Sequence, residues 1–357
     1  MKNLKKILLC GALSSMMMLS ACASGGSSQE TTSNETTVTP TTQETEQEET
    51  NTESDSQDTA ENPAIVISNF GQELTYEQAP ERVITLSYGP TEIMVALGLE
   101  DHMIAIAEAD NTIDIVSEEH REVTSLLPII AKAEDGGVPT LEVVLAETPD
   151  FVYGSSFGFN ADYGVGAADD FLSNEINIYA SASTYKEMAT IEDTYEEILD
   201  MGKIFRVEER AQVLVDTMKA DYDYIASAVA GVEPVTVMLY NSGTDSPYVY
   251  FESSFLSNLA TAAGATNVVT GDGSAARITM EAVIEANPEY IVVMEDTWQP
   301  VEEKIAYFQS RPELADITAI KENNFVVISL EYSCFSSVHN IEAIEIMAKA
   351  FHPECFE

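Results

Sequence analysis

The sequence predicts an α/β protein of two similar lobes, each with a mainly parallel sheet, joined by one long α-helix. After residue 80, short apolar runs that suit buried strands alternate with helical patterns, which is typical of a parallel sheet flanked by helices. The alternation stops between residues 191 and 229, where apolar residues recur every three or four positions. One helix–proline–strand string also occurs twice, at residues 140–154 and 279–293.

The repeated string reads TLEVVLAETPDFVYG in its first copy and TMEAVIEANPEYIVV in its second. Each copy begins with a threonine that suits a helix N-cap, and a proline marks the turn between its helix and its strand. The residues common to both copies are Thr140 and Thr279, Glu142 and Glu281, Val144 and Val283, and Pro149 and Pro288. We therefore expect the two copies to hold equivalent places in two similar lobes.

The first lobe is expected over residues 63–189 and the second over residues 232–357. In the first lobe, apolar runs predict strands at 82–87, 103–108, 150–155 and 176–181, and helical patterns cover 90–99, 140–149 and 168–175. In the second lobe, strands are expected at 235–240, 290–295 and 325–330, and helices at 253–264, 279–288, 302–312 and 339–353.

The connecting helix is predicted within residues 190–231. Its pattern continues for about 35 residues without a proline, which corresponds to a helix about 50 Å long. A helix of that length exceeds what one lobe needs, so we expect it to join the two lobes.

The first 21 residues are typical of a secretory signal peptide. Lysines at the start precede an apolar run at residues 7–19, which is shorter than the roughly 20 apolar residues of a stable membrane span. The run ends in Leu-Ser-Ala-Cys, which resembles the lipobox of bacterial lipoproteins. That resemblance implies cleavage before Cys22 and a lipid anchor on its sulfur, with the protein held on the extracytoplasmic face of the cell membrane.

Residues 22–62 are predicted to form a disordered tether. They are rich in Ser, Thr, Glu and Gln and contain almost no apolar residues, so they lack the surface whose burial offsets the entropy of ordering. About 295 residues follow, which is more than a single core usually contains and agrees with two lobes.

The charge and the cysteines exclude several functions. The chain has 61 acidic and 16 basic residues, for a net charge of -45, which argues against binding nucleic acid. Only Cys334 and Cys355 lie beyond the tether. A helix of about 14 residues is expected between them, and its length of about 20 Å favours two free thiols over a disulfide. No zinc spacing, dinucleotide fingerprint or phosphate-binding loop is present, and we expect no cofactor.

Taken together, these features resemble the substrate-binding proteins of ABC importers for iron–siderophore complexes, haem and cobalamin. The matching strings are RVITLSYGPTEIMVALGLEDHMIAIA, the two repeated strings, FLSNLATAAGATNVV and the C-terminal IEAIEIMAKAFHPE. The resemblance implies a monomeric lipoprotein, not an enzyme, that captures an iron chelate between its lobes and delivers it to a membrane permease. Cobalamin, another corrinoid or haem are alternative ligands. A surface sensor, an adhesin or an enzyme on the same scaffold are alternatives of other classes.

The ligand site is expected between the lobes, at the carboxyl ends of the strands, where open α/β sheets bind ligands. Mostly aromatic and acidic side chains follow the predicted strands, and stacking on aromatic rings would supply much of the affinity. The candidate ligand-binding residues are Tyr88, Glu108, Phe157, Tyr240, Arg277, Trp298 and Tyr332.

The composition of this list also bears on the charge of the ligand and on metals. Arg277 is its one cation, whereas anionic catecholate complexes are usually paired with arginines; a neutral or cationic ligand is therefore favoured. His339, at the start of the last predicted helix, is a possible metal ligand or a helix-start residue with backbone contacts. No second histidine is near it in the sequence, so we expect no dedicated metal site.

The family resemblance also implies one surface glutamate on each lobe that pairs with arginines of the permease. Glu92 and Glu281 match these two positions, and Glu142, the repeat partner of Glu281, is the substitute for Glu92 in the first lobe. A carboxylate near a helix N-terminus also suits the helix dipole, which is the alternative explanation for all three.

Overall fold

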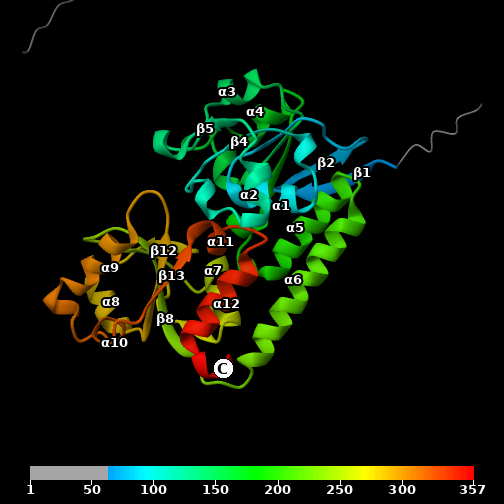
Figure 1. Cartoon of the computed structure of the whole chain (residues 1–357). Coiled ribbons are helices and arrows are strands. Elements are labelled where there is room, and N and C mark those ends of the chain that lie inside the picture. Colours follow the sequence, from blue (N-terminus) through cyan, green and yellow to red (C-terminus); the bar gives the residue numbers. More distant parts are fainter. Residues whose placement is uncertain (1–62) are drawn as a thin grey trace, which may run out of the picture. The chain divides into compact units, whose positions relative to one another are not determined.

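The computed structural model describes residues 63–357 (Figure 1). The predicted signal peptide, Cys22 and the whole of the predicted tether lie outside these residues. Among residues 63–357, no helix is both long enough and apolar enough to cross a membrane.

The first lobe is a five-stranded parallel sheet in the order β5-β4-β3-β6-β7. Its strands are β3 (Val83–Thr85), β4 (Met103–Ala107), β5 (Ile129–Ala131), β6 (Phe151–Ser155) and β7 (Asn177–Ser181). The helices that accompany them are α1 (Tyr88–Ala96), α2 (Glu118–Thr124), α3 (Leu141–Ala146) and α4 (Ala168–Leu172). An antiparallel hairpin of β1 (Ile65–Asn69) and β2 (Gln72–Tyr76) precedes the sheet and was not predicted.

The second lobe is a six-stranded sheet with the order β11-β9-β8-β12-β13, and β10 also pairs with β8. Its strands are β8 (Val235–Ser242), β9 (Tyr248–Tyr250), β10 (Ala265–Asn267), β11 (Ala275–Arg277), β12 (Tyr290–Glu295) and β13 (Phe325–Ser329). Its helices are α7 (Phe255–Ala262), α8 (Met280–Ala286), α9 (Val301–Gln309), α10 (Thr318–Lys321), α11 (Leu330–Cys334) and α12 (Asn340–Phe351). Only the pairings of β9 with β8 and with β11 are antiparallel, so the predicted fold class is confirmed.

The repeated string holds equivalent places in the two lobes. Thr140 caps α3 through the backbone N–H of Val143, and Thr279 caps α8 through that of Ala282. After each proline, an acidic side chain accepts hydrogen bonds at the start of the neighbouring strand. Asp150 accepts from the backbone of Arg82 before β3, and Glu289 accepts from that of Thr236 in β8. The pairs β3–β6 and β8–β12 are therefore built by the same local rules.

The connecting segment is two helices, α5 (Ile191–Ile204) and α6 (Glu208–Ala228), in place of the single helix of 35 residues that the sequence predicts. Arg206 adopts a left-handed conformation with φ of 60°, and the backbone N–H of Val207 donates to the carbonyl of Gly202 at 2.8 Å. These features form a Schellman motif, which ends α5 without a glycine or proline. The chain then reverses, and α6 packs along α5 and α12 (Figure 1).

The largest core cluster is continuous across both lobes. It includes Val83 of β3, Ile198 of α5, Val215 of α6, Val292 of β12 and Met347 of α12. Two smaller clusters lie apart from it, one in each lobe. Because the inner sides of the lobes share one core, we expect the boundary between them to be stiff.

Candidate ligand-binding site between the lobes

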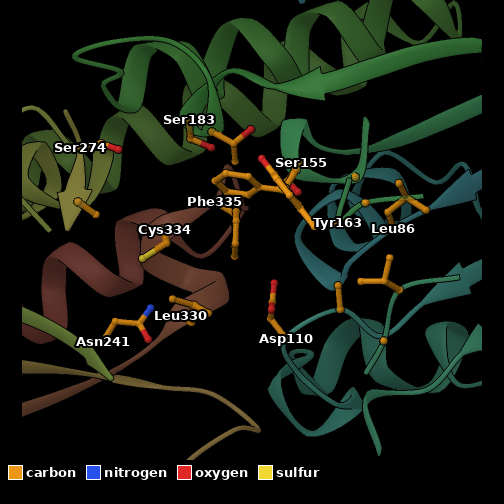
Figure 2. A pocket seen from close by; sticks show the side chains of 18 of the residues that line it. Leu86, Asp110, Ser155, Tyr163, Ser183, Asn241, Ser274, Leu330, Cys334 and Phe335 are labelled. Carbon is orange, nitrogen blue, oxygen red and sulfur yellow. The ribbon is translucent and has the colours of Figure 1, made fainter. Parts of the chain in front are cut away.

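A cavity of about 590 Å³ lies between the lobes and is lined by residues of both (Figure 2). Its lining includes Asp110 after β4, Ser155 of β6, Asn241 of β8, Trp298 after β12 and Leu330 after β13. The cavity therefore lies at the carboxyl ends of strands in both sheets, where the sequence places the site. Its volume is in the range of pockets that enclose one small molecule.

Three of the predicted ligand residues, Phe157, Arg277 and Trp298, line this cavity. Phe157 is 51% exposed and Trp298 is 61% exposed, so both aromatic rings remain available to a ligand. The backbone N–H groups of Trp298 and Gln299 donate to the Asp296 carboxylate at 2.9 and 3.2 Å, which fixes the turn that carries Trp298. Direct contact of these residues with a ligand remains a prediction.

The other four predicted ligand residues do not line the cavity. Tyr88 is buried, and its hydroxyl donates to Glu108 at 2.8 Å. Tyr240 lies inside β8, which continues to Ser242, and its buried ring packs edge-on against Phe308. The hydroxyl of Tyr332 donates to the carbonyl of Ile115. In this structure Tyr88, Glu108, Tyr240 and Tyr332 are used in packing or in internal hydrogen bonds and lie away from the cavity lining. Their contact with a ligand stays an untested prediction.

Several lining residues were not among the predicted ones. Tyr163 is the most exposed aromatic residue of the lining. It precedes Gly164, where an added Cβ would lie 2.2 Å from the carbonyl oxygen of Phe157, so this tight loop requires glycine. Val138, Tyr248, Tyr250 and Phe335 add further apolar surface. The glycines at 158, 164 and 166, which follow the predicted strand at 150–155, are a sequence signal that could have indicated this loop and Tyr163.

The polar lining consists mainly of hydroxyl groups, together with the amide of Asn241 and the carboxylate of Asp110. The Asp110 carboxylate has no hydrogen-bond partner within residues 63–357, and it points into the open space between the lobes (Figure 2). Burial and the neighbouring Asp296 raise the pKa of Asp110 to about 6. Asn241 is 4% exposed and donates through Nδ2 to the Tyr250 hydroxyl at 3.0 Å, whereas its Oδ1 has no partner within the described residues.

The chemistry of the lining favours binding over nucleophilic attack. Cys334 lies at the cavity, but burial raises the pKa of its thiol to about 12, so the unreactive protonated form prevails at neutral pH. Cys334 and Cys355 are both free, as the sequence favours. Among the described residues, no three His, Cys, Asp or Glu side chains are arranged to hold a metal ion.

Glu92 lies at a closed contact between the lobes. Its side chain is 1% exposed, and it binds His120 of α2 at 3.1 Å and His339, at the start of α12, at 3.0 Å. Burial alone would raise the pKa of Glu92, but hydrogen bonds from His120, His339 and Ser117 outweigh it and hold that pKa near 2. The expectation of a surface carboxylate at Glu92 is therefore wrong.

Two further polar contacts cross the same boundary, and a third joins the connecting helix α5 to the second lobe. The backbone N–H of Gly89 donates to the buried Glu331 carboxyl at 2.5 Å, and that of Ser336 donates to the Ser183 hydroxyl at 2.8 Å. The Thr194 hydroxyl donates to Asn340 at 2.9 Å. We refer to these contacts, together with Glu92, His120 and His339, as the interlobe contact. From the sequence, no second histidine was expected near His339. His120 is that second histidine, and it is remote from His339 in the sequence.

The two glutamates of the repeat are exposed, in contrast to Glu92. Glu142 lies in the first turn of α3 and Glu281 in the first turn of α8. Because α1 begins at Tyr88, Glu92 lies in its second turn, which faces the second lobe. The pair of accessible, equivalent carboxylates is therefore Glu142 and Glu281.

Two lobes with a cavity at the ends of their strands define a binding protein, and comparison with known proteins agrees. Residues 83–332 match the model of the periplasmic binding protein family, and the chain belongs to that family. It is 23% identical over 298 residues to the uncharacterized ABC transporter substrate-binding lipoprotein YvrC of Bacillus subtilis, covering 83% of this chain and 87% of that protein.

Solved structures share the fold. A periplasmic binding protein from Veillonella parvula is 24% identical, with a TM-score of 0.71, over 81% of this chain and 98% of that one. A protein of an ABC-type Fe3+-hydroxamate transport system from Saccharomonospora viridis is 21% identical, with a TM-score of 0.70, over 80% of this chain and 98% of that one. At these identities the likeness establishes the fold.

Proposed function

We propose that this protein is the extracytoplasmic substrate-binding lipoprotein of an ABC importer and that it captures an iron chelate between its lobes. Family membership supports the general role. The observation that carries the ligand class is the cavity itself, which presents exposed aromatic rings from both lobes and only one cation, Arg277. Such a lining suits a compact complex with an apolar periphery and no net negative charge, as a ferric hydroxamate has.

The test is a titration that Trp298 reports, because it is the only tryptophan of the chain and lines the cavity. Ferric hydroxamates, ferric catecholates, haem and cobalamin are added separately to the mature protein. We expect saturable, one-to-one quenching by a ferric hydroxamate, with the complex recovered unchanged. A response to haem or cobalamin alone would identify that compound as the ligand in place of an iron chelate. Chemical conversion of the added complex would indicate an enzyme. If none of these compounds changed the fluorescence of the folded protein, this ligand class would be ruled out.

Delivery requires two further features of the chain. The lipid on Cys22 would hold the protein at the membrane, so Cys22→Ser should release it into the medium, and unchanged membrane fractionation would contradict this. Glu142 and Glu281 would dock the lobes on the permease, because they are exposed, equivalent carboxylates, one on each lobe. Arginine–carboxylate pairs at such sites set orientation more than affinity.

A further inference from the structure

The cavity presents one carboxylate without a protein partner. Asp110, from the first lobe, is half-buried and lines the cavity, and its carboxylate makes no hydrogen bond within residues 63–357. A carboxylate that loses water when a ligand binds costs free energy unless a donor group replaces that water. The complementary group on a ligand is a strong donor, and beside a carboxylate the strongest donor carries a positive charge.

The groups around Asp110 do not neutralise it. Asp296 is paired with the buried Lys304 at 2.7 Å, so that lysine is already engaged. Burial raises the pKa of Glu331 to about 8 and that of Cys334 to about 12, so both are mainly neutral at pH 7. Arg277 lies at the exposed rim, where Nη1 donates to the carbonyl of Ser246 at 2.9 Å and the guanidinium lies over Tyr248.

The backbone at Asp110 is also unusual and is held from the other lobe. Asp110 has φ of 66°, a left-handed conformation that few residues other than glycine adopt. Both the backbone N–H and the hydroxyl of Thr297, beside Trp298, donate to the carbonyl of Asp110 at 3.2 Å. The two lobes thus clamp the residue that presents the carboxylate, and conformational strain of this kind is often found at binding sites.

We propose that the cavity recognises a ligand that carries a protonated amine, which pairs with the carboxylate of Asp110. The inference rests on the proposed function and specifies its ligand as a cationic iron chelate. The net charge of the chain, -45, acts in the same direction, because it draws cations toward the protein.

A pH dependence follows from the same geometry. Burial and the neighbouring Asp296 raise the pKa of Asp110 to about 6, and an ammonium group beside the carboxylate favours its charged form. Affinity for the amine-bearing ligand is therefore greatest above pH 6 and falls as the pH drops below it, where Asp110 takes up a proton. A ligand without the amine has no such dependence on Asp110.

The test uses a matched pair of probes, a linear ferric trihydroxamate with a free primary amine and the same complex with that amine acetylated. Both are titrated into the wild type, Asp110→Asn and Asp245→Asn. Asparagine tolerates the left-handed conformation of Asp110. Asp245, whose side chain is 96% exposed and lies outside the cavity lining, is a control for the loss of one negative charge.

We expect the wild type to prefer the free amine by about ten- to a hundredfold, the range of a charge-assisted hydrogen bond. Asp110→Asn should abolish the preference, and Asp245→Asn should retain it. Titration of the wild type at pH 5 and pH 8 is a second measurement that needs no variant, and only the amine form should bind more weakly at pH 5. Equal binding of the two probes would overturn the inference while the iron-chelate function stands. Binding of neither would overturn the inference, and the iron-chelate function would fall with it only if the folded protein also failed to respond to the other ferric chelates.

Discussion

At the interlobe contact, the Glu92 carboxylate pairs with side chains of both lobes, whereas at the cavity between the same lobes the Asp110 carboxylate makes no hydrogen bond within residues 63–357. Glu92 is surrounded by His120, His339 and Ser117. The carboxylate of Asp110 lines the cavity and has no such partners among the described residues. The difference suggests two roles, because paired groups hold the lobes in register, whereas an unpaired carboxylate is available to a ligand.

The largest expected effect comes from Glu92→Gln at the interlobe contact. The pKa of Glu92 is lowered from 4.5 to about 2, which corresponds to about 3 kcal/mol of stability at neutral pH. We expect Glu92→Gln to lower the free energy of unfolding by about this amount in urea denaturation, with the affinity of the folded protein unchanged. Glu142→Gln, at an exposed glutamate, is the matched control, and an equal loss in both variants would contradict the assignment.

The same contact predicts how stability depends on pH. The lowered pKa of Glu92 contributes stability that is present above pH 4.5 and is lost as the pH falls toward 2. Burial lowers the pKa of His339, but contacts with Glu92 and Glu342 outweigh it and raise the value above 6.5. The stability that His339 contributes is fully present below pH 6.5 and is lost as the pH rises through its raised pKa. Denaturation midpoints from pH 2 to 9 should be highest between about 4.5 and 6.5, and the maximum should flatten in Glu92→Gln.

In the cavity, Trp298→Ala should act on affinity and not on stability. Its ring is exposed without a ligand, so little packing is lost. Loss of one stacking contact with a bound chelate should weaken binding by about 1 kcal/mol, or roughly fivefold. Calorimetry measures this, since the fluorescent reporter is absent, and Trp298→Phe should keep most of the affinity. Unchanged affinity of Trp298→Ala would remove this residue from the site.

The smallest effect on stability and on ligand affinity is expected from the double variant Glu142→Ala/Glu281→Ala. Each carboxylate is exposed in the first turn of its helix, where a dipole contact contributes well under 1 kcal/mol. The variant should bind its ligand normally but fail to support uptake by the reconstituted importer. If the double variant supported uptake at the wild-type rate, neither residue would have the docking role.

Local signals in the sequence predicted most of the fold. The repeat placed α3 with β6 and α8 with β12 in equivalent positions, because caps and prolines act within a few residues. The break between α5 and α6 was missed, since Arg206 takes a left-handed conformation that arginine seldom adopts. The hairpin of β1 and β2 was missed as well.

The site was predicted less completely than the fold, because burial depends on distant partners. Glu92 and His339 are 247 positions apart, and no local pattern shows that they meet. The sequence predicted that the strand ends at Tyr240, but β8 continues for two more residues, to Ser242. Trp298 is exposed at the cavity, as predicted from the polar turn around it, because such a turn buries an indole poorly.

The central claim is that a ligand occupies the cavity while the interlobe contact stays closed. The most direct measurement is a crystal structure of the mature protein with the amine-bearing ferric trihydroxamate. We expect the complex beside Trp298, with its ammonium on Asp110 and with the Glu92–His339 pair intact at about its present distance of 3.0 Å. A complex bound outside the cavity, or lobes separated at Glu92, would contradict the account.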